Sequence, residues 1–495
     1  MTPTPTNLPN HAQRNDLATA LRRIVPAENV LAQDEQLRPY ECDGLSAYRQ
    51  LPLLVVLPET VEQVRNIVRL CHERKVPIVA RGAGTGLSGG ALPHADGVLL
   101  SLAKLNRVLR VDPQARMARV QPGVRNLAIS AAAAPHGLYY APDPSSQIAC
   151  SIGGNVAENS GGVHCLKYGL TVHNILELKV VTIDGELLTI GSEALDAPGY
   201  DLLALLTGSE GMLGIVVEVA VRLLPKPART QVMLAAYDSV VAAGETVGAI
   251  IGAGIVPAGL EMMDQLAIKA AEDFVHVGYP TGAAAVLLCE VDGTNEEVSD
   301  NVAAIRAIMR ECGAIDVRTA QDEKECALLW KGRKAAFPAV GRLAPDYYCM
   351  DGTIPRRCLA EVLEEIARLS AHYALPVANV FHAGDGNLHP LILFDANQPG
   401  ELAKAEEFGG KILELCVRVG GTITGEHGVG MEKINQMCTQ FSAPELQQFH
   451  AVKHAFDPDG LLNPGKAVPT LHRCAEFGAM HVHKGALPFP NLERF

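Results

Sequence analysis

Three glycine-rich loops, separated by short runs typical of β-strands, constrain the fold of this chain more than any other feature of its sequence. The first loop follows the apolar run 76–80 and reads Arg81-Gly82-Ala83-Gly84-Thr85-Gly86-Leu87-Ser88-Gly89-Gly90. Glycines directly after a strand let successive backbone N–H groups converge on an anion, because no Cβ atom obstructs the approach. The loop therefore predicts an anion-binding turn, although a glycine-rich surface loop would give the same pattern.

Gly84, Gly86 and Gly89 of this loop match the spacing of the dinucleotide-binding fingerprint, G-x-G-x-x-G. A Rossmann site also requires a helix that begins inside the motif. The residues that follow, 91–97, read Ala-Leu-Pro-His-Ala-Asp-Gly and do not form a helical pattern. We therefore reject a Rossmann NAD site at this position.

Two further loops in the same region also present many backbone N–H and hydroxyl groups. The second loop combines residues 142–146 with residues 151–162, and the third spans residues 208–214. One such loop suffices for a single phosphate, whereas three in one region predict a longer ligand that carries a diphosphate.

The three loops together resemble the FAD-binding domain of the vanillyl-alcohol-oxidase, or para-cresol-methylhydroxylase (PCMH), type of flavoprotein, over residues 51–225. Covalent members of that superfamily carry a histidine near the end of the first glycine loop, where this chain has Thr85. The resemblance therefore implies a non-covalent FAD. The candidate cofactor-binding residues are Arg81, Gly82, Ala83, Gly84, Thr85, Gly86, Ser88, Gly89, Gly90, Pro142, Asp143, Ser145, Ser146, Gly153, Gly154, Asn155, Asn159, Ser160, Gly161, Gly208, Glu210, Gly214, Ile215 and Asn463.

Two histidines flank a predicted turn in residues 379–390. Asp385-Gly386 is a type I′ hairpin signal, and a two-residue loop there would place His382 opposite His389. Directly opposed residues project to one face with Cβ atoms about 4.5–5.5 Å apart. Two imidazoles placed in this way can share one divalent metal ion. Two ordinary hydrogen-bonded histidines on a hairpin are the alternative interpretation.

A second motif, residues 420–430, contains Glu426 and His427 flanked by glycines, so the backbone can bend and present both side chains. A loop that starts a helix, with Glu426 supporting its N-terminal cap, is the alternative. Both motifs resemble the D-2-hydroxyacid dehydrogenase branch of the flavin superfamily. The resemblance implies that His382, His389 and Glu426 hold a divalent metal ion, Zn or Mn, and that His427 is the catalytic base.

The segment 330–337 contains Arg333, which matches the arginine that binds the substrate carboxylate in this branch. A guanidinium group suits a carboxylate because it can donate two parallel hydrogen bonds. A solvated arginine on a helix face is the alternative. Asn387, on the histidine hairpin, is a candidate contact to the substrate or the flavin. Phe337 replaces a polar residue of 2-hydroxyglutarate-type relatives, and residues 347–351 lack the lysine of those relatives, so we expect a small monocarboxylate substrate.

The order of expected elements predicts an α+β chain. Asp184-Gly185 is a two-residue hairpin signal between the strand-like runs 176–183 and 186–190. After Pro225-Lys226-Pro227, strands and helices alternate, which predicts helices on one face of a sheet. We expect an N-terminal segment (1–50), a PCMH-type FAD-binding domain (51–226), a substrate or cap domain with the metal site (227–430), a helical segment that returns to the FAD domain (431–470) and a tail (471–495).

Charge and composition exclude several functional classes. The formal net charge is −13, from 42 basic and 55 acidic residues, which opposes binding to nucleic acid. The sequence contains neither a signal-peptide pattern nor an apolar run long enough to span a bilayer, so we expect a cytoplasmic protein with reduced thiols. Its 12 cysteines form no Cys-x-x-Cys pair, so an iron–sulfur relay would belong to another protein.

Over nearly its whole length, including residues 347–357 and 474–483, the chain resembles the FAD-linked subunits of bacterial glycolate oxidases. The resemblance implies oxidation of a small 2-hydroxy acid, glycolate to glyoxylate, by hydride transfer to flavin N5. It also implies partners, a second flavin-type subunit and an iron–sulfur subunit, that would hold the protein at the inner face of the cell membrane. D-lactate and D-2-hydroxyglutarate dehydrogenases are alternatives within the branch. A metallohydrolase or a non-catalytic flavin-carrying scaffold are alternatives from other classes.

Overall fold

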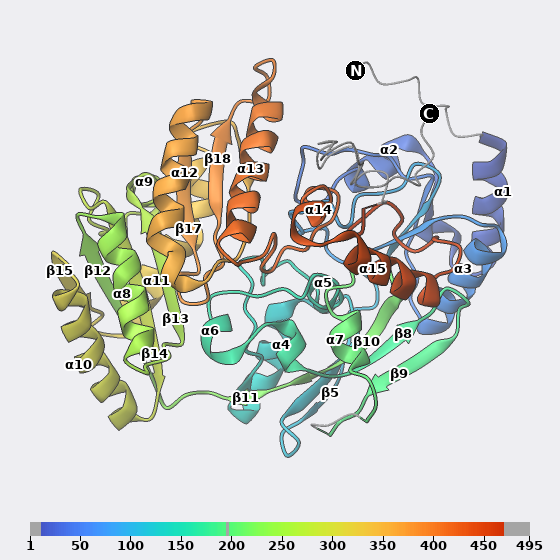
Figure 1. Cartoon of the computed structure of the whole chain (residues 1–495). Coiled ribbons are helices and arrows are strands. Elements are labelled where there is room, and N and C mark those ends of the chain that lie inside the picture. The colour runs from blue at the N-terminus through green and yellow to red at the C-terminus, as the bar shows by residue number, and fades with distance from the viewer. Residues whose placement is uncertain (1–10, 195–197, 470–495) are drawn as a thin grey trace.

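The computed structural model describes residues 11–194 and 198–469, which form two halves that lie side by side (Figure 1). The N-terminal half, blue to green in Figure 1, contains a four-stranded and a five-stranded sheet. The C-terminal half, green to orange, is built on one seven-stranded sheet. The predicted α+β class is confirmed, since helices pack against sheets in both halves.

The four-stranded sheet positions the first glycine loop. Its strands, in spatial order, are β1 (Val30–Leu31), β2 (Leu54–Val56), β4 (Val98–Ser101) and β3 (Ile78–Arg81). Helix α3 (Val61–Glu73) connects β2 to β3; Thr60 caps its first turn, and its apolar face is buried against the sheet. The loop leaves the carboxyl end of β3, and no helix forms between Gly82 and Gly97. The chain therefore lacks the strand–loop–helix geometry of a Rossmann site here, as expected.

The five-stranded sheet is antiparallel, with the spatial order β5 (Val108–Asp112), β6 (Met117–Val120), β10 (Ile215–Arg222), β8 (Ile175–Val181) and β9 (Leu187–Gly191). A hairpin joins β8 to β9 at Asp184-Gly185, but the prediction of a two-residue loop is wrong. Thr182 N donates to Glu186 O (2.9 Å), so three residues form the loop. Gly185 has φ of 72°, the left-handed conformation that closes a three-residue hairpin loop.

Short elements complete the N-terminal half, and the end of the chain returns to it. The short elements are α1 (His11–Leu21), α2 (Asp34–Leu37), α4 (Asn126–Ala133), β7 (Leu138–Tyr139), α5 (Ile152–Glu158), α6 (Cys165–Tyr168), α7 (Leu202–Leu206) and β11 (Leu224–Pro225). The returning helices, red in Figure 1, are α14 (Met437–Gln440) and α15 (Ala443–Phe456). After them, Leu461 O accepts a hydrogen bond from Ile78 N at the start of β3 (2.8 Å). The predicted tail, 471–495, lies outside the described residues.

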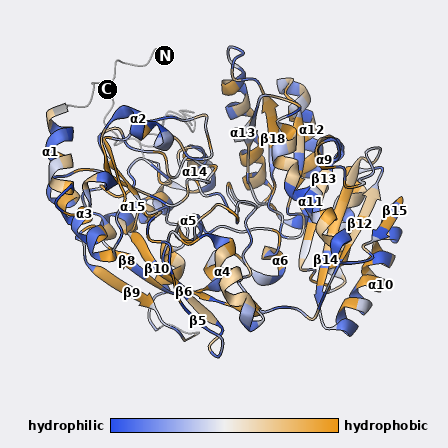
Figure 2. Cartoon of the chain, turned by 180° about the vertical axis from the view of Figure 1, so that it is seen from behind, coloured by the Kyte–Doolittle hydropathy of each residue, from blue (hydrophilic) through white to orange (hydrophobic). Residues whose placement is uncertain are grey.

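The C-terminal half contains an antiparallel sheet with the spatial order β15 (Asp316–Thr319), β12 (Arg229–Tyr237), β14 (Ala285–Gly293), β13 (Gly259–Asp264), β17 (Val377–Phe381), β18 (Pro390–Phe394) and β16 (Asp346–Cys349). Its strands are mainly hydrophobic, as Figure 2 shows for β12 and β14. The helices of this half are α8 (Val240–Gly252), α9 (Gln265–Val275), α10 (Asn295–Glu311), α11 (Glu323–Val340), α12 (Leu359–Tyr373) and α13 (Glu401–Arg418).

These helices cover both faces of the seven-stranded sheet, so the prediction of helices on one face is wrong. Met233 and Ala235 of β12 pack in one apolar cluster with α8, α10, α12 and α13. Val232 and Leu234 of the same strand pack in another with α9 and α11. Successive residues of a strand point to opposite faces. The uninterrupted apolar run 232–237 of β12 therefore needs cover on both sides.

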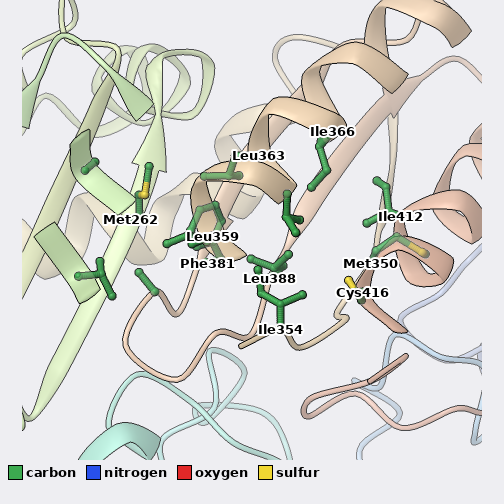
Figure 3. Close-up of a cluster of buried hydrophobic side chains, with 14 of the residues drawn as sticks. Met262, Met350, Ile354, Leu359, Leu363, Ile366, Phe381, Leu388, Ile412 and Cys416 are labelled. Carbon is green, nitrogen blue, oxygen red and sulfur yellow. The ribbon is translucent and has the colours of Figure 1, made fainter. Parts of the chain in front are cut away.

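The first of these clusters supports the hairpin that carries the two candidate metal-binding histidines. Figure 3 shows Phe381 and Leu388 within the cluster, beside Leu359 of α12. Phe381 precedes His382, and Leu388 precedes His389. Since neighbouring strand residues point to opposite sides, burial of these two side chains turns both histidines toward the other side.

Two expectations concern the chain as a whole. Within residues 11–194 and 198–469, no helix combines the length and the hydropathy needed to cross a bilayer. The cysteines from Cys42 to Cys416 are free thiols, and most of them are buried, but Cys438 is disulfide-bonded, so the expectation of reduced thiols is wrong at that position.

Candidate active site

The three glycine-rich loops meet around one cavity of about 480 Å³ that extends to the histidine hairpin. Its lining also includes Lys334, Phe337, His389, Glu426 and His427 from the C-terminal half. Of the predicted cofactor-binding residues, those that line the cavity are Arg81, Gly82, Ala83, Gly84, Thr85, Gly86, Gly90, Ser145, Ser146, Gly153, Gly154, Asn155, Ser160, Glu210, Gly214 and Ile215. A ligand bound by the loops would therefore reach the candidate catalytic residues.

The other predicted cofactor-binding residues lie outside this lining: Ser88, Gly89, Pro142, Asp143, Asn159, Gly161, Gly208 and Asn463. Some of them connect the loops. Asn463 Nδ2 donates to Gly90 O (2.8 Å) and to Glu210 O (2.7 Å), so this side chain joins the first loop to the third. Asp143 Oδ1 accepts a hydrogen bond from His164 N (3.2 Å). These two side chains therefore hold the loops in place without lining the cavity.

The lining of the cavity fits a polar cofactor such as FAD. Ser151 Oγ and Glu158 Oε2 are buried and make no hydrogen bond within the described residues. A Cβ atom on Gly82 would lie 2.1 Å from Ser151 Oγ, so a side chain there would have to displace this hydroxyl. Glycine backbone without side chains, next to buried polar groups that lack a hydrogen bond, suits a ligand with phosphate and amide groups. Thr85 lies in the lining at the position discussed above for covalent attachment.

The histidine hairpin differs in register from the prediction. His382 N donates to Asn387 O (3.1 Å) and Val380 N donates to His389 O (3.3 Å), so the loop holds four residues rather than two. His389 is therefore opposite Val380, and the two histidines are diagonal neighbours. A shift by two residues leaves every side chain on its original face, whereas a shift by one would have separated the histidines.

His382, His389 and Glu426 form a compact group. Glu426 Oε1 lies 3.3 Å from Nε2 of each histidine, and the three possible ligand atoms all lie within 4.8 Å of one another. Both ring nitrogens of His389 are buried without a hydrogen bond in the described part of the chain. Two imidazole nitrogens and a carboxylate oxygen are typical zinc or manganese ligands, so this donor set fits a divalent ion.

A buried carboxylate, Asp351, holds the backbone around Glu426 and His427. Asp351 Oδ2 accepts hydrogen bonds from Glu426 N (3.0 Å) and His427 N (2.6 Å), and Oδ1 pairs with Lys433 Nζ (2.7 Å). Burial alone would raise the pKa of Asp351, but Lys433 and these N–H groups outweigh it and hold the pKa below its usual range. The Glu210 carboxylate holds the next part of this backbone, since it accepts hydrogen bonds from Val429 N and Gly430 N (both 2.8 Å), but burial raises the pKa of Glu210.

His427 lines the cavity and stacks on His389, with ring centroids 4.9 Å apart. Its Nδ1 faces Asp351 Oδ2 (3.8 Å), and its Nε2 lies 3.9 Å from Glu426 Oε1. Burial lowers the pKa of His427 to about 4, although Asp351 opposes this shift. A neutral imidazole of this kind can accept a proton from a bound molecule.

Arg333 and Asn387, the two predicted substrate contacts, do not line this cavity. Arg333 is 2% exposed, and its Nη2 pairs with Glu261 Oε2 at 2.6 Å, while its Nε is buried without a hydrogen bond among the described residues. Asn387 Nδ2 donates to Asp351 O (3.0 Å) and to Thr353 Oγ1 (3.2 Å). Asn387 thus ties the hairpin to the Asp351 segment.

Sequence reasoning missed Glu261, Asp351 and Lys433, all of them buried charged residues at this site. Glu261 is an acidic residue inside an apolar strand, and Asp351 follows the apolar residues at and just after the end of β16, Cys349 and Met350. Charged residues are rarely fully buried unless they are paired, so these positions carried a usable signal. Lys334, an exposed cation in the cavity lining, was also missed.

Comparisons with known proteins agree with this geometry. Residues 52–191 match a family model described as an FAD binding domain, and residues 226–467 match one described as FAD linked oxidases, C-terminal domain. A solved structure of p-cresol methylhydroxylase with substrate bound shares the fold, with a TM-score of 0.79 at 18% identity. That similarity covers 94% of this chain and 98% of the other. The predicted PCMH-type fold is confirmed.

Curated relatives span nearly the whole chain. The glycolate oxidase subunit GlcD of Escherichia coli strain K12 is 68% identical over 97% of each chain. The GlcD subunit of Bacillus subtilis strain 168 is 41% identical, over 91% of this chain and 96% of that protein. A D-lactate dehydrogenase of Anaerostipes hadrus is 32% identical, over 91% of this chain and 97% of that protein. The chain is an FAD-dependent oxidoreductase and belongs to the family of FAD-linked oxidases that includes the glycolate oxidase subunits.

Proposed function

We propose that this chain oxidises glycolate to glyoxylate, with FAD bound in the glycine-lined cavity. One observation carries the proposal: this cavity ends at His389, Glu426 and His427, so a flavin and a candidate base share one space. The name of the 68%-identical relative, a glycolate oxidase subunit, supports the choice of substrate. In this proposal residues 51–226 bind FAD, residues 227–430 bind substrate and metal, and residues 431–470 return to the FAD domain.

The residues of the site have distinct roles in this mechanism. His382, His389 and Glu426 would hold a divalent ion, Zn or Mn, which supplies a Lewis acid that lowers the pKa of the substrate hydroxyl. Arg333 would anchor the substrate carboxylate through its buried, unpaired Nε. Bound FAD supplies the acceptor, at N5, for the hydride that leaves the α-carbon.

His427 would take the hydroxyl proton at Nε2. Since Glu426, which lies 3.9 Å from Nε2, would be engaged by the ion, the Asp351 carboxylate 3.8 Å from Nδ1 favours the tautomer with the proton on Nδ1 and the lone pair on Nε2. The Asp351 contact with His427 N and the stacking on His389 keep the ring in place. Loss of the proton to His427 and of the hydride together convert the alcohol to the carbonyl.

Anaerobic flavin reduction tests the function directly. The purified chain, loaded with FAD, is mixed with glycolate, D-lactate or D-2-hydroxyglutarate, and bleaching of the flavin absorbance is followed. We expect glycolate to bleach the flavin within one turnover. A yellow protein that none of these acids bleaches would instead favour a flavin-carrying scaffold.

The substrate preference follows from the charge of the pocket. Phe337 lines the cavity and Cys349 is buried in an apolar cluster, so neither offers a second cation. Lys334 is exposed, and an exposed ion pair between Lys334 and the second carboxylate of a dicarboxylate substrate would add little to the free energy of substrate binding. We therefore expect glycolate and D-lactate to exceed D-2-hydroxyglutarate and D-malate in kcat/KM by about tenfold or more. Preference for a dicarboxylate in steady-state assays would contradict this assignment.

The cofactor is expected to be non-covalent, because Thr85 replaces the histidine of covalent superfamily members. Acid precipitation of the purified protein should release all of the flavin into the supernatant, where its absorbance is measured against the total. Yellow colour that stays in the pellet would show a covalent bond. This outcome would leave the proposed reaction intact.

We also propose that electrons leave the flavin through partner proteins, a second flavin-type subunit and an iron–sulfur subunit, which would hold the chain at the inner face of the membrane. The name of the 68%-identical relative, a subunit of glycolate oxidase, supports this proposal, and the absence of a Cys-x-x-Cys pair in the sequence is consistent with it. D-lactate dehydrogenase is the second candidate function, favoured by the 32%-identical relative of that name. The anaerobic comparison of glycolate with D-lactate decides between them.

A further inference from the structure

Glu261 is a fully buried carboxylate between the candidate metal group and the candidate substrate-binding arginine. It lies on β13, next to the residue pair Met262–Phe381 that joins β13 to β17, and its side chain is 1% exposed. Its Oε1 lies 2.7 Å from His382 Nδ1, and its Oε2 lies 2.6 Å from Arg333 Nη2. One carboxylate therefore contacts both groups, with one oxygen for each.

The contact with His382 determines which nitrogen of that ring is free. When Nδ1–H donates to Glu261, the lone pair of the neutral imidazole is on Nε2. Nε2 is the atom that faces Glu426 Oε1, at 3.3 Å, and hence the atom available to a metal ion shared with His389. Outer carboxylates that orient a ligating histidine in this way also increase its basicity toward the metal.

The contact with Arg333 sets the position of a buried cation. Arg333 projects from α11, and Glu261 is the carboxylate that the described residues place against its guanidinium group. An uncompensated guanidinium at this depth would be costly and would repel a metal ion beside it. The Glu261 charge offsets that repulsion, while Arg333 Nε is buried without a hydrogen bond among the described residues.

We propose that Glu261 is the positioning residue of this site, which fixes His382 for metal binding and Arg333 for the substrate carboxylate at the same time. This inference rests on the proposed function, since it takes the metal group and the arginine as parts of one site. Glu261 itself contacts neither substrate nor cofactor in this arrangement. Its effects should appear in metal affinity and in KM rather than in FAD binding.

A matched control exists on the neighbouring strand. Glu290 on β14 is also a buried carboxylate that pairs with a histidine, His164 (3.1 Å), and with Trp330, but none of these three belongs to the metal group. Glu290→Gln thus removes an equivalent buried charge without touching the proposed positioning contacts. A merely structural role for buried carboxylates would affect both variants alike.

The test measures metal affinity without turnover. FAD-loaded protein is stripped of metal, and Zn²⁺ or Mn²⁺ is titrated back in competition with a chelating indicator, for the parent, Glu261→Gln and Glu290→Gln. We expect Glu261→Gln to weaken metal binding about 10–100-fold, and Glu290→Gln to leave it unchanged. In assays with glycolate, Glu261→Gln should raise KM more than it lowers kcat, because Arg333 loses its partner.

A double variant keeps the test informative if Glu261→Gln unfolds. Glu261→Gln combined with Arg333→Met removes the uncompensated cation, so this protein should fold and still show the loss of metal affinity from the His382 contact. The inference would be overturned if Glu261→Gln and the double variant bound the metal ion with an affinity within about twofold of the parent. It would also be overturned if the parent protein bound neither Zn²⁺ nor Mn²⁺. If glycolate fails to bleach the parent flavin while Glu261→Gln still weakens metal binding, the proposed function fails and the positioning of His382 stands.

Discussion

Replacement of His427 by asparagine is expected to slow flavin reduction by glycolate about 100-fold or more in a single turnover. An amide cannot accept the hydroxyl proton, and a positioned base contributes about 10²–10⁴ in rate, or about 3–5 kcal/mol. The contact between the backbone N–H of residue 427 and Asp351 Oδ2 does not involve the side chain, so the loop should keep its shape. Stopped-flow absorbance of the anaerobic, FAD-loaded variant measures the effect.

Metal analysis of the same samples separates a base from a ligand. His427 is not among the atoms that can converge on a metal ion within the described residues, so His427→Asn should retain the parent metal content. Glu426→Gln is the comparison variant, because it replaces the carboxylate that faces both histidines and should lower metal content. An unchanged reduction rate in His427→Asn, or metal loss equal to that of Glu426→Gln, would remove His427 from the role of base.

The sequence predicted the composition of the site better than its local geometry. The hairpin signal at Asp385-Gly386 correctly indicated that His382 and His389 share a face, but the loop has four residues rather than two. Gly384 N donates to Leu260 O on β13 (2.9 Å), so the turn is shaped by a neighbouring strand as well as by its own residues. Local turn propensity contains no information about such a contact.

The sheet prediction failed for a related reason. The alternation of strands and helices after Pro227 predicts that the helices pack on a sheet, but it does not predict the face on which each helix lies. The uninterrupted apolar run 232–237 within β12 is the sequence signal that indicates cover on both faces. The Asn463 amide joins Gly90 to Glu210, and this long-range contact has no sequence pattern; that Asn463 also binds the cofactor stays a prediction.

The residues that position others are the part least visible in sequence. Asp351 lies in the loop after β16 and Glu261 lies on β13, so both reach the site only after the sheet has formed. Their partners lie far along the chain: Lys433 and His427 for Asp351, and His382 and Arg333 for Glu261. A motif search finds ligands and bases because these occur in short glycine-flanked segments. The buried carboxylates behind them become evident only through their contacts.

Loss of the metal ion is expected to have an effect at least as large as loss of the base. His382→Ala removes one of three ligands, and chelation of the parent protein removes the ion with all ligands intact. Either treatment should lower substrate-driven flavin reduction by about three powers of ten, since a Lewis acid contributes several kcal/mol to the stabilisation of developing negative charge. Stopped-flow reduction with glycolate, before and after addition of Zn²⁺ or Mn²⁺, measures this loss and identifies the ion that restores the rate.

FAD content distinguishes loss of the ion from loss of the cavity. His382 does not line the glycine-rich cavity, so His382→Ala should retain its flavin, as should the chelated parent. His164→Ala is a suitable control, because His164 is another ion-paired histidine, held by Asp143 and Glu290 outside the metal group. If His164→Ala keeps its metal while His382→Ala loses it, the effect belongs to ligation rather than to the removal of a paired imidazole. Full activity in protein shown by elemental analysis to be free of divalent metal would contradict the prediction, and His427, His389 and Glu426 would then act on the substrate without an ion.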